Sequence, residues 1–335
     1  MDERGFPLRI VAWELTRSCN LECLYCRASA TKEVPQGELT TSECKSIIDS
    51  IASFSSPIII LTGGEPLLRK DIFEIVEHGS IKKGLHMVFA TNGSLLTKET
   101  VRILKALEIK RISLSLDGKD KESHDGLRGV EGSFDCVIEA TKILNEEGMP
   151  FQINTTITSL NIREIESIFE LTKSLGACAW HLFFFVPVGR GKSIKDKGLE
   201  AMEYEKTLKR IYELAQRKEI EIKVTCAPQY YRILKEEGEE LRGSGCLAGK
   251  SFMFISHVGV AQPCGYLEIP SGDVRAHGVR YVWEKSEVFL RLRNFREYQG
   301  RCGKCRYIKI CGGCRARAYE EFGDFMEEEP LCTIS

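Results

Sequence analysis

Short apolar runs alternate with longer amphipathic runs through residues 8–186, and this alternation limits the possible folds more than any other feature of the chain. The apolar runs have the length of buried strands and lie at 8–15, 57–61, 86–90, 111–116, 151–157 and 180–186. The runs between them carry apolar residues at helical spacing, at 41–54, 71–83, 98–107, 134–147 and 162–175. Strands and helices in this order form a parallel sheet with right-handed crossovers. The sequence therefore predicts an α/β fold, a partial (β/α)6 TIM-like barrel.

A polar or glycine-bearing motif follows nearly every predicted strand. The motifs lie at 19–26, 62–66, 91–93, 113–118, 154–156 and 187–192. Active groups of a parallel barrel belong at the carboxyl ends of its strands. We therefore expect these motifs to gather at one rim.

Three cysteines in the first motif, Cys19, Cys23 and Cys26, are spaced by three and then two residues. Three thiolates at this spacing can hold three irons of a cubic iron–sulfur cluster and leave the fourth iron open to an exogenous ligand. Four-thiolate clusters usually transfer electrons, and structural zinc sites usually close with four ligands. Taken alone, the motif also allows a zinc knuckle or three incidental thiols in a loop.

The 14 cysteines among 335 residues are better explained by metal than by disulfides, because ten of them fall in two groups near the two ends of the chain. The net charge of -1 argues against a polyanion binder, and the run 8–15 is too short for a membrane span or a secretory signal. We expect a cytoplasmic protein that binds neither nucleic acid nor membrane. Cys44, Cys136 and Cys178 lie outside both groups and are expected to be small buried hydrophobes.

The cysteine loop and the turn Gly63-Gly64-Glu65-Pro66 resemble those of the radical S-adenosylmethionine (SAM) enzymes. Two glycines let backbone carbonyls approach a ligand closely, and Glu65 can meet an ammonium group. The resemblance implies a 4Fe-4S cluster on the three cysteines, SAM chelated to its open iron, and the turn holding the amino group of SAM. Further cofactor contacts implied by the resemblance are Asn92, then Ser115, Asp117 and Asn154 on the ribose side, and Arg128 at the SAM carboxylate. A satisfied polar residue at a strand end is an equally good account of any one of them.

The C-terminal cysteines resemble the SPASM extension of these enzymes, which carries up to two auxiliary 4Fe-4S clusters. The seven positions are Cys246, Cys264, Cys302, Cys305, Cys311, Cys314 and Cys332. Only two residues separate Cys311 from Cys314, where the family often has three, and this leaves the ligand partition open. The resemblance implies one cluster on Cys302, Cys305, Cys311 and Cys332, and a second on Cys246, Cys264 and Cys314. Cys226 is positioned to complete the second; otherwise an open iron would face substrate or solvent.

The strand–helix rhythm ends after a helix at 199–217 and a short strand at 221–225. We expect one more helix at 230–241 and place the domain boundary within 226–245. The predicted domains are a barrel at 1–225 and an auxiliary-cluster domain at 226–335.

Between Arg291 and Arg317, nine Lys or Arg residues face one acidic residue, Glu297. Thiolate-bound clusters are anionic, so we assign these cations to cluster stabilisation, since the aromatic-studded stripe of a single-strand binder is missing. A structural zinc ribbon is the alternative for this region. Seven ligands are too many for one zinc ion and too few for two closed sites, which disfavours it.

Four segments narrow the resemblance to the haem-biosynthesis branch of the radical SAM/SPASM enzymes, and within it to the alternative haem b synthases. They lie at 13–19, 151–156, 181–191 and 263–267. The branch implies oxidative decarboxylation of two propionates of Fe-coproporphyrin III to vinyls, giving haem b. The nearest alternatives are enzymes that decarboxylate the acetates of sirohaem or build haem d1. A SPASM peptide maturase and a non-catalytic electron carrier are further hypotheses. Maturases often carry a leader-recognition domain before the barrel, whereas here only about eight residues precede the first predicted strand.

The implied chemistry needs no catalytic side chain beyond the cluster and SAM. A 5′-deoxyadenosyl radical abstracts hydrogen from a propionate, and loss of carbon dioxide releases one electron, for which an auxiliary cluster is a sensible acceptor. A ferredoxin or flavodoxin type of donor would supply the electrons. The carboxylates of the tetrapyrrole need cations, for which Arg17, Arg27, Arg190 and Lys192 are candidates, and its ring needs an apolar wall, for which 183–185 are candidates. His181 or His257 would be the ligand of the porphyrin iron, although a core or surface role is commoner for a histidine.

Overall fold

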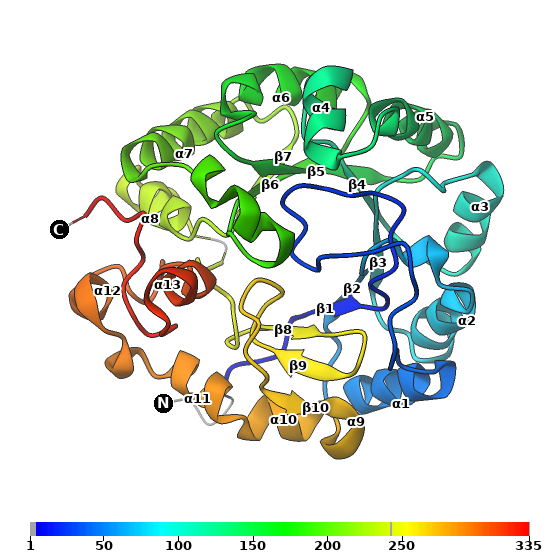
Figure 1. The fold of residues 1–335 in the computed structure, drawn as a ribbon. Helices are drawn as coiled ribbons and strands as arrows, with labels where there is room; N and C mark the ends of the chain where they lie inside the picture. Colours follow the sequence, from blue (N-terminus) through cyan, green and yellow to red (C-terminus); the bar gives the residue numbers. More distant parts are fainter. Residues whose placement is uncertain (1–4, 242, 335) are drawn as a thin grey trace.

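A single sheet of ten strands runs through the computed structural model, which describes residues 5–241 and 243–334 (Figure 1). The strand order is β10-β9-β8-β1-β2-β3-β4-β5-β6-β7. Strands β1 to β7 pair in parallel, β8 pairs in parallel on the other side of β1, and β9 and β10 continue antiparallel. The bounds are β1 Ile10–Glu14, β2 Ile58–Thr62, β3 Met87–Thr91, β4 Ile112–Ser115, β5 Phe151–Ile157, β6 Ala179–Phe184, β7 Glu221–Thr225, β8 Phe252–Ile255, β9 Val260–Gln262 and β10 Gly272–Asp273.

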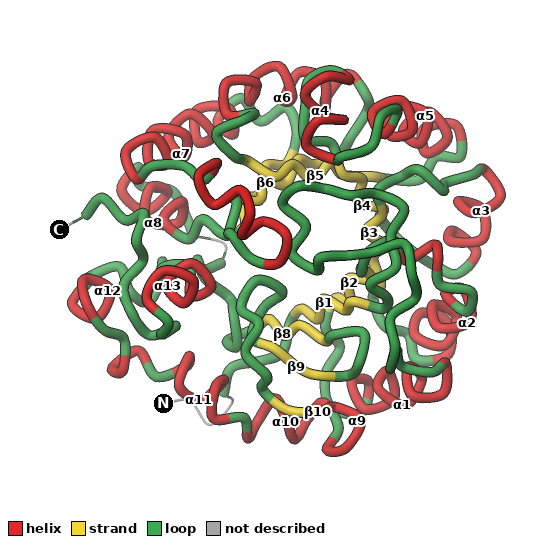
Figure 2. The backbone as a smooth tube through the Cα atoms, in the orientation of Figure 1, coloured by secondary structure: helices red, strands yellow, loops and turns green. Residues whose placement is uncertain are grey.

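Helices cover the outside of the curved sheet, and long loops fill its inner side (Figure 2). Around the parallel strands these are α1 Thr41–Ala52, α2 Ile72–Glu77, α3 Lys98–Ala106, α4 Lys121–Arg128, α5 Ser133–Glu146, α6 Ile165–Ser174 and α7 Ala201–Gln216. The C-terminal helices are α8 Gln229–Glu236, α9 Val274–His277, α10 Val279–Lys285, α11 Glu287–Arg293, α12 Gly300–Lys304 and α13 Arg315–Phe322. The predicted α/β partial barrel and its six strands are confirmed.

Each parallel strand separates an apolar core from the inner side of the barrel. In β1, Val11 and Trp13 are fully buried in the core that also contains helix α1. Successive side chains of a strand point to opposite faces, so Ala12 and Glu14 lie on the inner face. Glu14 is nevertheless fully buried, because the cysteine loop after β1 covers it. A carboxylate in this position requires charged partners.

Three helices, α2, α4 and α8, differ from the sequence prediction. The run 71–83 forms α2 and then a π-helical turn, His78–Lys82, because Gly79 packs so closely on the Met87 side chain that a Cβ would lie 2.4 Å from its sulfur. Helix α4 was not predicted, since it is polar and contains Gly126; the Asp120 side chain caps its start, and left-handed Gly129 ends it. Helix α8 is shorter than the predicted 230–241, with left-handed Gly238 following it.

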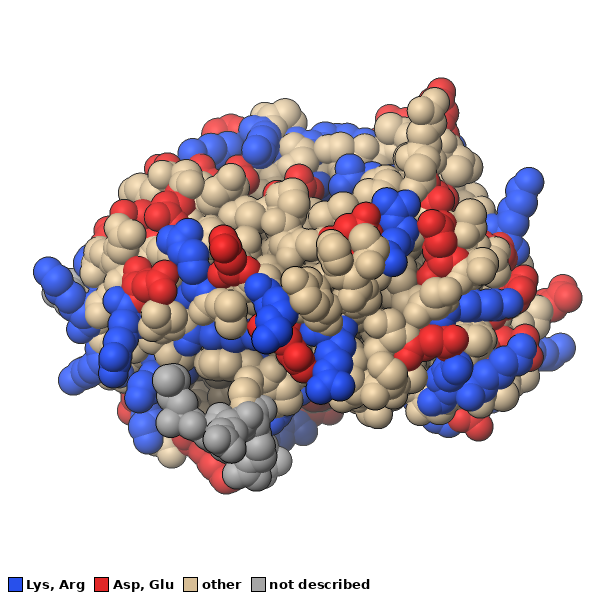
Figure 3. All heavy atoms as spheres, turned by 90° about the horizontal axis from the view of Figure 1, so that it is seen from below, with Lys and Arg blue, Asp and Glu red and all other residues tan. Residues whose placement is uncertain are grey.

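Strands β8 to β10 come from the predicted second domain, yet they extend the same sheet through the pairing of β8 with β1. The domain division at 225/226 stays a prediction, and the ten-stranded sheet continues across that boundary. Within the described residues, no helix is long and apolar enough to cross a membrane. On the face seen from below, Lys and Arg alternate with Asp and Glu and form no extended patch of one sign (Figure 3).

The three cysteines outside the two groups differ in burial. Cys44 of α1 is fully buried, as expected. Cys136 is half-buried, and Cys178 is exposed just before β6, where its thiol donates to the Phe151 carbonyl at 3.0 Å. The expectation of a buried side chain is therefore wrong for Cys178, because it lies at the exposed entrance of the strand.

Candidate functional site

The three N-terminal cysteines share one loop between β1 and α1, at the carboxyl end of the strand. Cys19 and Cys23 are buried and Cys26 is half-buried. Backbone amides point at two of the sulfurs: Leu21 N lies 3.4 Å from the Cys19 Sγ, and Ala30 N lies 3.4 Å from the Cys26 Sγ. Burial, and then the neighbouring thiols, raise the pKa of Cys19 to about 11. Metal binding would therefore displace protons from these thiols.

Arg128 and Asp117 contact side chains of this loop. The Arg128 Nη1 donates to the Cys23 Sγ at 3.6 Å, and its Nη2 lies 2.6 Å from the Asp117 Oδ2. The Tyr25 hydroxyl also donates to Asp117, and Thr156 N donates to it at 2.6 Å. Both residues were predicted as SAM contacts; the structure turns the Asp117 carboxylate toward the cysteine loop and places the Arg128 guanidinium on a cluster ligand.

The glycine turn after β2 packs on the backbone of residues 16–18. A Cβ on Gly63 would lie 2.4 Å from the Thr16 carbonyl oxygen, and one on Gly64 would lie 2.2 Å from that of Ser18. In return, Gly64 N donates to the Thr16 carbonyl at 2.7 Å. The glycines thus join the turn to the cysteine loop as well as leaving room for a ligand.

The Glu65 carboxylate is fully buried and points inward. It accepts hydrogen bonds from the Thr91 hydroxyl at 2.8 Å, from Asn92 N at 2.8 Å and from Leu67 N at 3.1 Å. Burial raises its pKa to about 7, against the lowering effect of these hydrogen bonds. Glu65 therefore ties the turn to the end of β3, and its contact with an ammonium group stays a prediction.

Three predicted polar contacts lie at the carboxyl ends of β3, β4 and β5. The Asn92 amide donates to the Asn20 side chain at 2.9 Å and approaches the Cys19 Sγ at 3.9 Å. Ser115 and Asn154 are register partners on β4 and β5, so their side chains lie side by side on the inner face. The rim predicted from the sequence therefore exists, with the cysteine loop, the glycine turn and these strand ends together.

Two of the four candidate substrate cations are engaged elsewhere. The Arg190 guanidinium donates to the Cys23 carbonyl at 2.9 Å and to the Ala30 carbonyl, so it staples the cysteine loop. Lys192 is exposed and lies 3.3 Å from Glu320 of α13. Neither contact leads into the inner side of the barrel.

Arg17 and Arg27 both pair with Glu14, a residue that was not predicted to belong to the site. The Arg17 Nε and the Arg27 Nη1 each lie 2.9 Å from a Glu14 oxygen, and the His257 Nδ1 lies 2.8 Å from it. Burial alone would raise the pKa of Glu14, but the His257 hydrogen bond and the two arginines lower it to about 2. The available signal was a single carboxylate at the end of an otherwise apolar strand.

Four C-terminal cysteines form one neighbourhood, which includes Cys226. The Cys226 thiol donates a hydrogen bond to the Cys314 sulfur, and this bond and then burial raise the pKa of Cys226; the thiol of Cys264 adds to this effect. Burial and then the thiols of Cys246 and Cys314 raise the pKa of Cys264. Cys226 has a left-handed backbone with φ of 58°, and Arg317 donates to its carbonyl. The structure therefore brings Cys226 to the three cysteines that lacked a fourth ligand.

The other C-terminal cysteines gather around a buried arginine. Burial raises the pKa of Cys311, and the thiols of Cys302 and Cys332 raise it further. Cys305 follows Cys302 at the end of α12. The Arg315 Nη2 donates to the Cys302 Sγ at 3.5 Å, and Arg315 is fully buried. This contact agrees with the assignment of the basic segment to cluster stabilisation.

Neither neighbourhood has the compact geometry of a site for one ion. Within the described residues, no group of three or more Cys, His, Asp or Glu side chains is arranged to hold a single metal ion. Four cysteine thiols in each neighbourhood are the donor set that a 4Fe-4S cluster takes, so the chemistry of these residues suits that cofactor.

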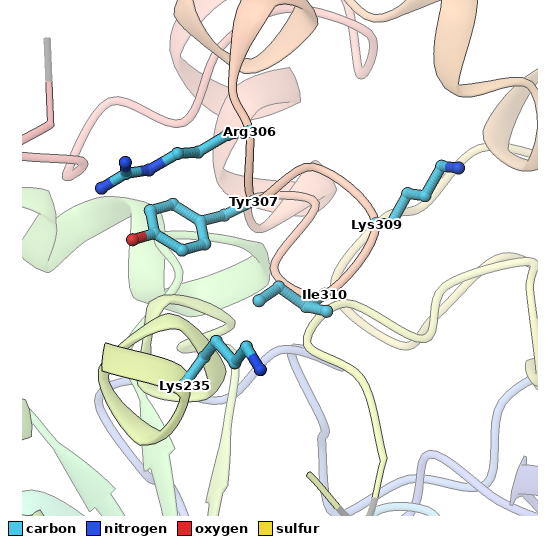
Figure 4. Close-up of a pocket in the computed structure, with 5 residues that line it drawn as sticks. All are labelled: Lys235, Arg306, Tyr307, Lys309 and Ile310. Carbon is cyan, nitrogen blue, oxygen red and sulfur yellow. The ribbon is translucent and has the colours of Figure 1, made fainter. Parts of the chain in front are cut away.

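A cavity of about 490 Å³ lies on the surface beside the second C-terminal neighbourhood. Its lining joins Lys235 of α8 to the loop between Cys305 and Cys311, which contributes Arg306, Tyr307, Lys309 and Ile310 (Figure 4). Among the described residues, no salt bridge engages Lys235, Arg306 or Lys309. The cavity is thus an open, cationic surface formed by α8 and the loop between Cys305 and Cys311.

Comparison with known proteins gives the family to which the chain is related. Residues 13–172 match the family model of the Radical SAM superfamily. The chain is 46% identical over 337 residues to the AdoMet-dependent heme synthase of Methanosarcina barkeri. This alignment covers 97% of this chain and 96% of that protein. It is 30% identical over 355 residues to the Fe-coproporphyrin III synthase of the same organism, covering 97% and 88%. Its fold is similar to that of Streptococcus suis SuiB bound to S-adenosylmethionine, with a TM-score of 0.80 at 21% identity over 98% of this chain and 78% of SuiB.

Proposed function

Because the chain belongs to the radical SAM superfamily, in the family of the AdoMet-dependent haem synthases, we propose that it converts two propionates of Fe-coproporphyrin III to vinyls and so forms haem b. It is an enzyme that uses a 4Fe-4S cluster and SAM. The observation that carries the substrate assignment is the 46% identity, over nearly the full length, to a haem synthase. The 30% identity to the Fe-coproporphyrin III synthase makes decarboxylation of a sirohaem-derived tetrapyrrole the second candidate.

In this proposal the cysteine loop and the strand ends around it bind the cofactors. Cys19, Cys23 and Cys26 hold the radical SAM cluster, and the amides of Leu21 and Ala30 stabilise its sulfurs. The turn at Gly63 and Gly64 takes the amino group of SAM, while Ser115 and Asn154 take the ribose. When bound and reduced, the cluster and SAM supply a 5′-deoxyadenosyl radical.

The reaction balances with one electron in and one electron out for each propionate. The β-carbon of the propionate would lose one hydrogen atom, which would be carried away in 5′-deoxyadenosine. The bond to the carboxylate then breaks, carbon dioxide leaves, and one electron is released as the vinyl double bond forms. Two propionates consume two SAM molecules, so the protein needs a path for electrons in both directions.

The C-terminal cysteines provide that path as two auxiliary clusters. One is held by Cys302, Cys305, Cys311 and Cys332, and the other by Cys226, Cys246, Cys264 and Cys314. The proximity of Cys226 to Cys264 and Cys314 supports the fourth ligand. A cluster on the second set would lie toward the radical site, because Tyr266 has the thiols of Cys226, Cys264 and Cys26 as electrostatic neighbours.

An acidic one-electron carrier of the ferredoxin or flavodoxin type docks on the cationic cavity lined by Lys235, Arg306 and Lys309. Opposite charges on two proteins accelerate their encounter and fix their orientation. The loop that carries Arg306 and Lys309 also carries Cys305 and Cys311, so a docked carrier would lie directly over an auxiliary cluster.

The test is an anaerobic assay of the reconstituted protein with SAM, a reductant and Fe-coproporphyrin III, followed by mass spectrometry of the tetrapyrrole. We expect two successive losses of carbon dioxide plus two hydrogens, ending at haem b, with one 5′-deoxyadenosine for each loss. Formation of 5′-deoxyadenosine with an unchanged porphyrin mass would overturn the substrate assignment, and sirohaem derivatives and then peptides would be tested next.

A further inference from the structure

His257 differs from the buried His124 and the half-buried His181 in which ring nitrogen carries the proton. The His181 Nδ1 lies 2.9 Å from the Gln152 amide nitrogen, which can only donate, and the His124 Nδ1 accepts from Asp117 N at 3.1 Å. Both imidazoles therefore carry their proton on Nε2. Without a free lone pair, neither can bind a metal from this tautomer.

His257 has the opposite tautomer. Its Nδ1 lies 2.8 Å from the Glu14 Oε1, and Glu14 is fully buried beside two arginines, which keep it ionised. An ionised carboxylate only accepts hydrogen bonds, so Nδ1 holds a proton, and in the neutral imidazole the free lone pair is then on Nε2. No described residue donates a hydrogen bond to this Nε2. A carboxylate that holds the far nitrogen is the arrangement that orients metal-binding histidines in proteins.

The remaining histidines lie away from the rim. His78 pairs with Asp49 at 2.7 Å on the outer helices, His86 precedes the amino end of β3, and His277 stacks on Tyr281 in α9 and α10. His257 instead follows β8 directly, beside the carboxyl end of β1. Its carbonyl accepts from Leu39 N at 2.8 Å, which fixes its backbone.

The surroundings of His257 suit a planar tetracarboxylate. Arg27 follows the cluster ligand Cys26, bonds to Glu14, and stacks its guanidinium over the Phe254 ring at 4.4 Å. Arg17 reaches Glu14 from the other side of the cysteine loop and is one-third exposed. Two cations, an aromatic ring and one free imidazole nitrogen therefore lie together on the inner side of the barrel, next to the radical site.

We propose that His257 binds the iron of the tetrapyrrole substrate through Nε2, and that Glu14 is its positioning residue. The inference rests on the proposed function, since an iron tetrapyrrole supplies the metal. A ligand on the axis of the ring leaves it free to turn about the iron–nitrogen bond. The two propionates that become vinyls in haem b lie on adjacent pyrroles, so a quarter turn about this axis would bring the second one to the position of the first.

Resonance Raman spectroscopy tests this directly. The reconstituted protein without SAM is titrated with ferrous coproporphyrin III that contains 54Fe, and tetrapyrrole binding is measured separately by equilibrium dialysis. We expect an iron–histidine stretching band that shifts with the iron isotope in the wild type and in His181→Ala. The band should disappear in His257→Ala, return in His257→Gly with added imidazole, and move to lower frequency in Glu14→Gln, because a neutral partner makes the imidazole a weaker donor.

The possible failures are distinguishable. If the wild type binds the tetrapyrrole and the band persists in His257→Ala, His257 is not the ligand while the proposed function stands. If the wild type binds no tetrapyrrole in dialysis, the proposed function fails and the inference fails with it. Iron and sulfide content and circular dichroism of each variant identify a folding defect, and the imidazole rescue in His257→Gly decides the question if His257→Ala does not fold.

Discussion

Gly64 has no room for a side chain, and this gives the sharpest test of how the glycine turn works. In Gly64→Ala, the new Cβ would lie 2.2 Å from the Ser18 carbonyl oxygen and 2.9 Å from that of Arg17. The turn and the cysteine loop must then move apart, and misplacement by about 1 Å costs roughly a hundred-fold in rate. We expect SAM cleavage, measured as 5′-deoxyadenosine released under dithionite, to fall by about that factor while the iron content stays that of the wild type.

Gly126→Ala is the matched control for this substitution. Gly126 lies within α4, and nothing lies within 4 Å of a Cβ added there. Alanine in a helix interior is favoured over glycine by up to about 1 kcal/mol, so this variant should be slightly more stable with unchanged SAM cleavage. Equal activity of the two variants would show that close packing of the turn on the cysteine loop is dispensable.

Cys226, in the turn between β7 and α8, gives a prediction at the scale of elements. Its φ of 58° is unfavourable for a side chain, and strain of this kind persists only where the surroundings require it. If its thiol completes the auxiliary cluster, Cys226→Ser should release iron to a chelator at least about ten-fold faster, because a thiolate ligand is lost. Anaerobic chelation followed by absorbance measures this rate.

Two further variants separate the thiol from the backbone. Cys226→Gly removes both the thiol and the cost of the left-handed conformation, so it should release iron as fast as Cys226→Ser. Cys178→Ser removes an exposed thiol outside both neighbourhoods and should behave as the wild type. Wild-type chelation kinetics in Cys226→Gly would mean that the position matters only for the turn, and that the second cluster has three protein ligands.

The elements that the sequence predicted best are those with a local signal. Buried parallel strands are apolar runs, so all six predicted strands are present and β5 matches its predicted bounds, Phe151–Ile157. Strands β8 to β10 escaped prediction because they are short and depend on pairing with β1, far away in the chain. Helix α4 escaped because it is polar, although it carries Arg128 to the cysteine loop.

In the whole molecule, the parts of the candidate site that were predicted are also those with a local sequence signal. The cysteine loop, the glycine turn and the C-terminal cysteines are spacing motifs, which a sequence displays directly. The contact between Glu14 and His257 joins residues 243 positions apart, and it forms only because β8 pairs with β1. The hydrogen bonds that turn Asp117, Arg128 and Arg190 toward the cysteine loop are also tertiary, so spacing alone could not distinguish them from ligand contacts.

The proposed docking of an acidic electron carrier at the cationic cavity can be tested by charge reversal. In the double variant Arg306→Glu and Lys309→Glu, the cavity repels an acidic carrier, and attraction of this kind changes association rates by about ten-fold or more. We expect the flavodoxin-driven rate of 5′-deoxyadenosine formation to fall by about ten-fold relative to the dithionite-driven rate of the same variant. The wild-type rate with flavodoxin should decline with added salt, since salt screens exposed charges, whereas the variant should lose that decline.

Lys110→Glu is the control for this charge reversal. Lys110 lies just before β4 and outside the lining of the cavity, so this variant should leave the ratio of the two rates unchanged. If the double variant keeps the wild-type ratio and salt dependence, the carrier docks elsewhere, and electrons enter the protein without passing beneath the loop of Cys305 and Cys311.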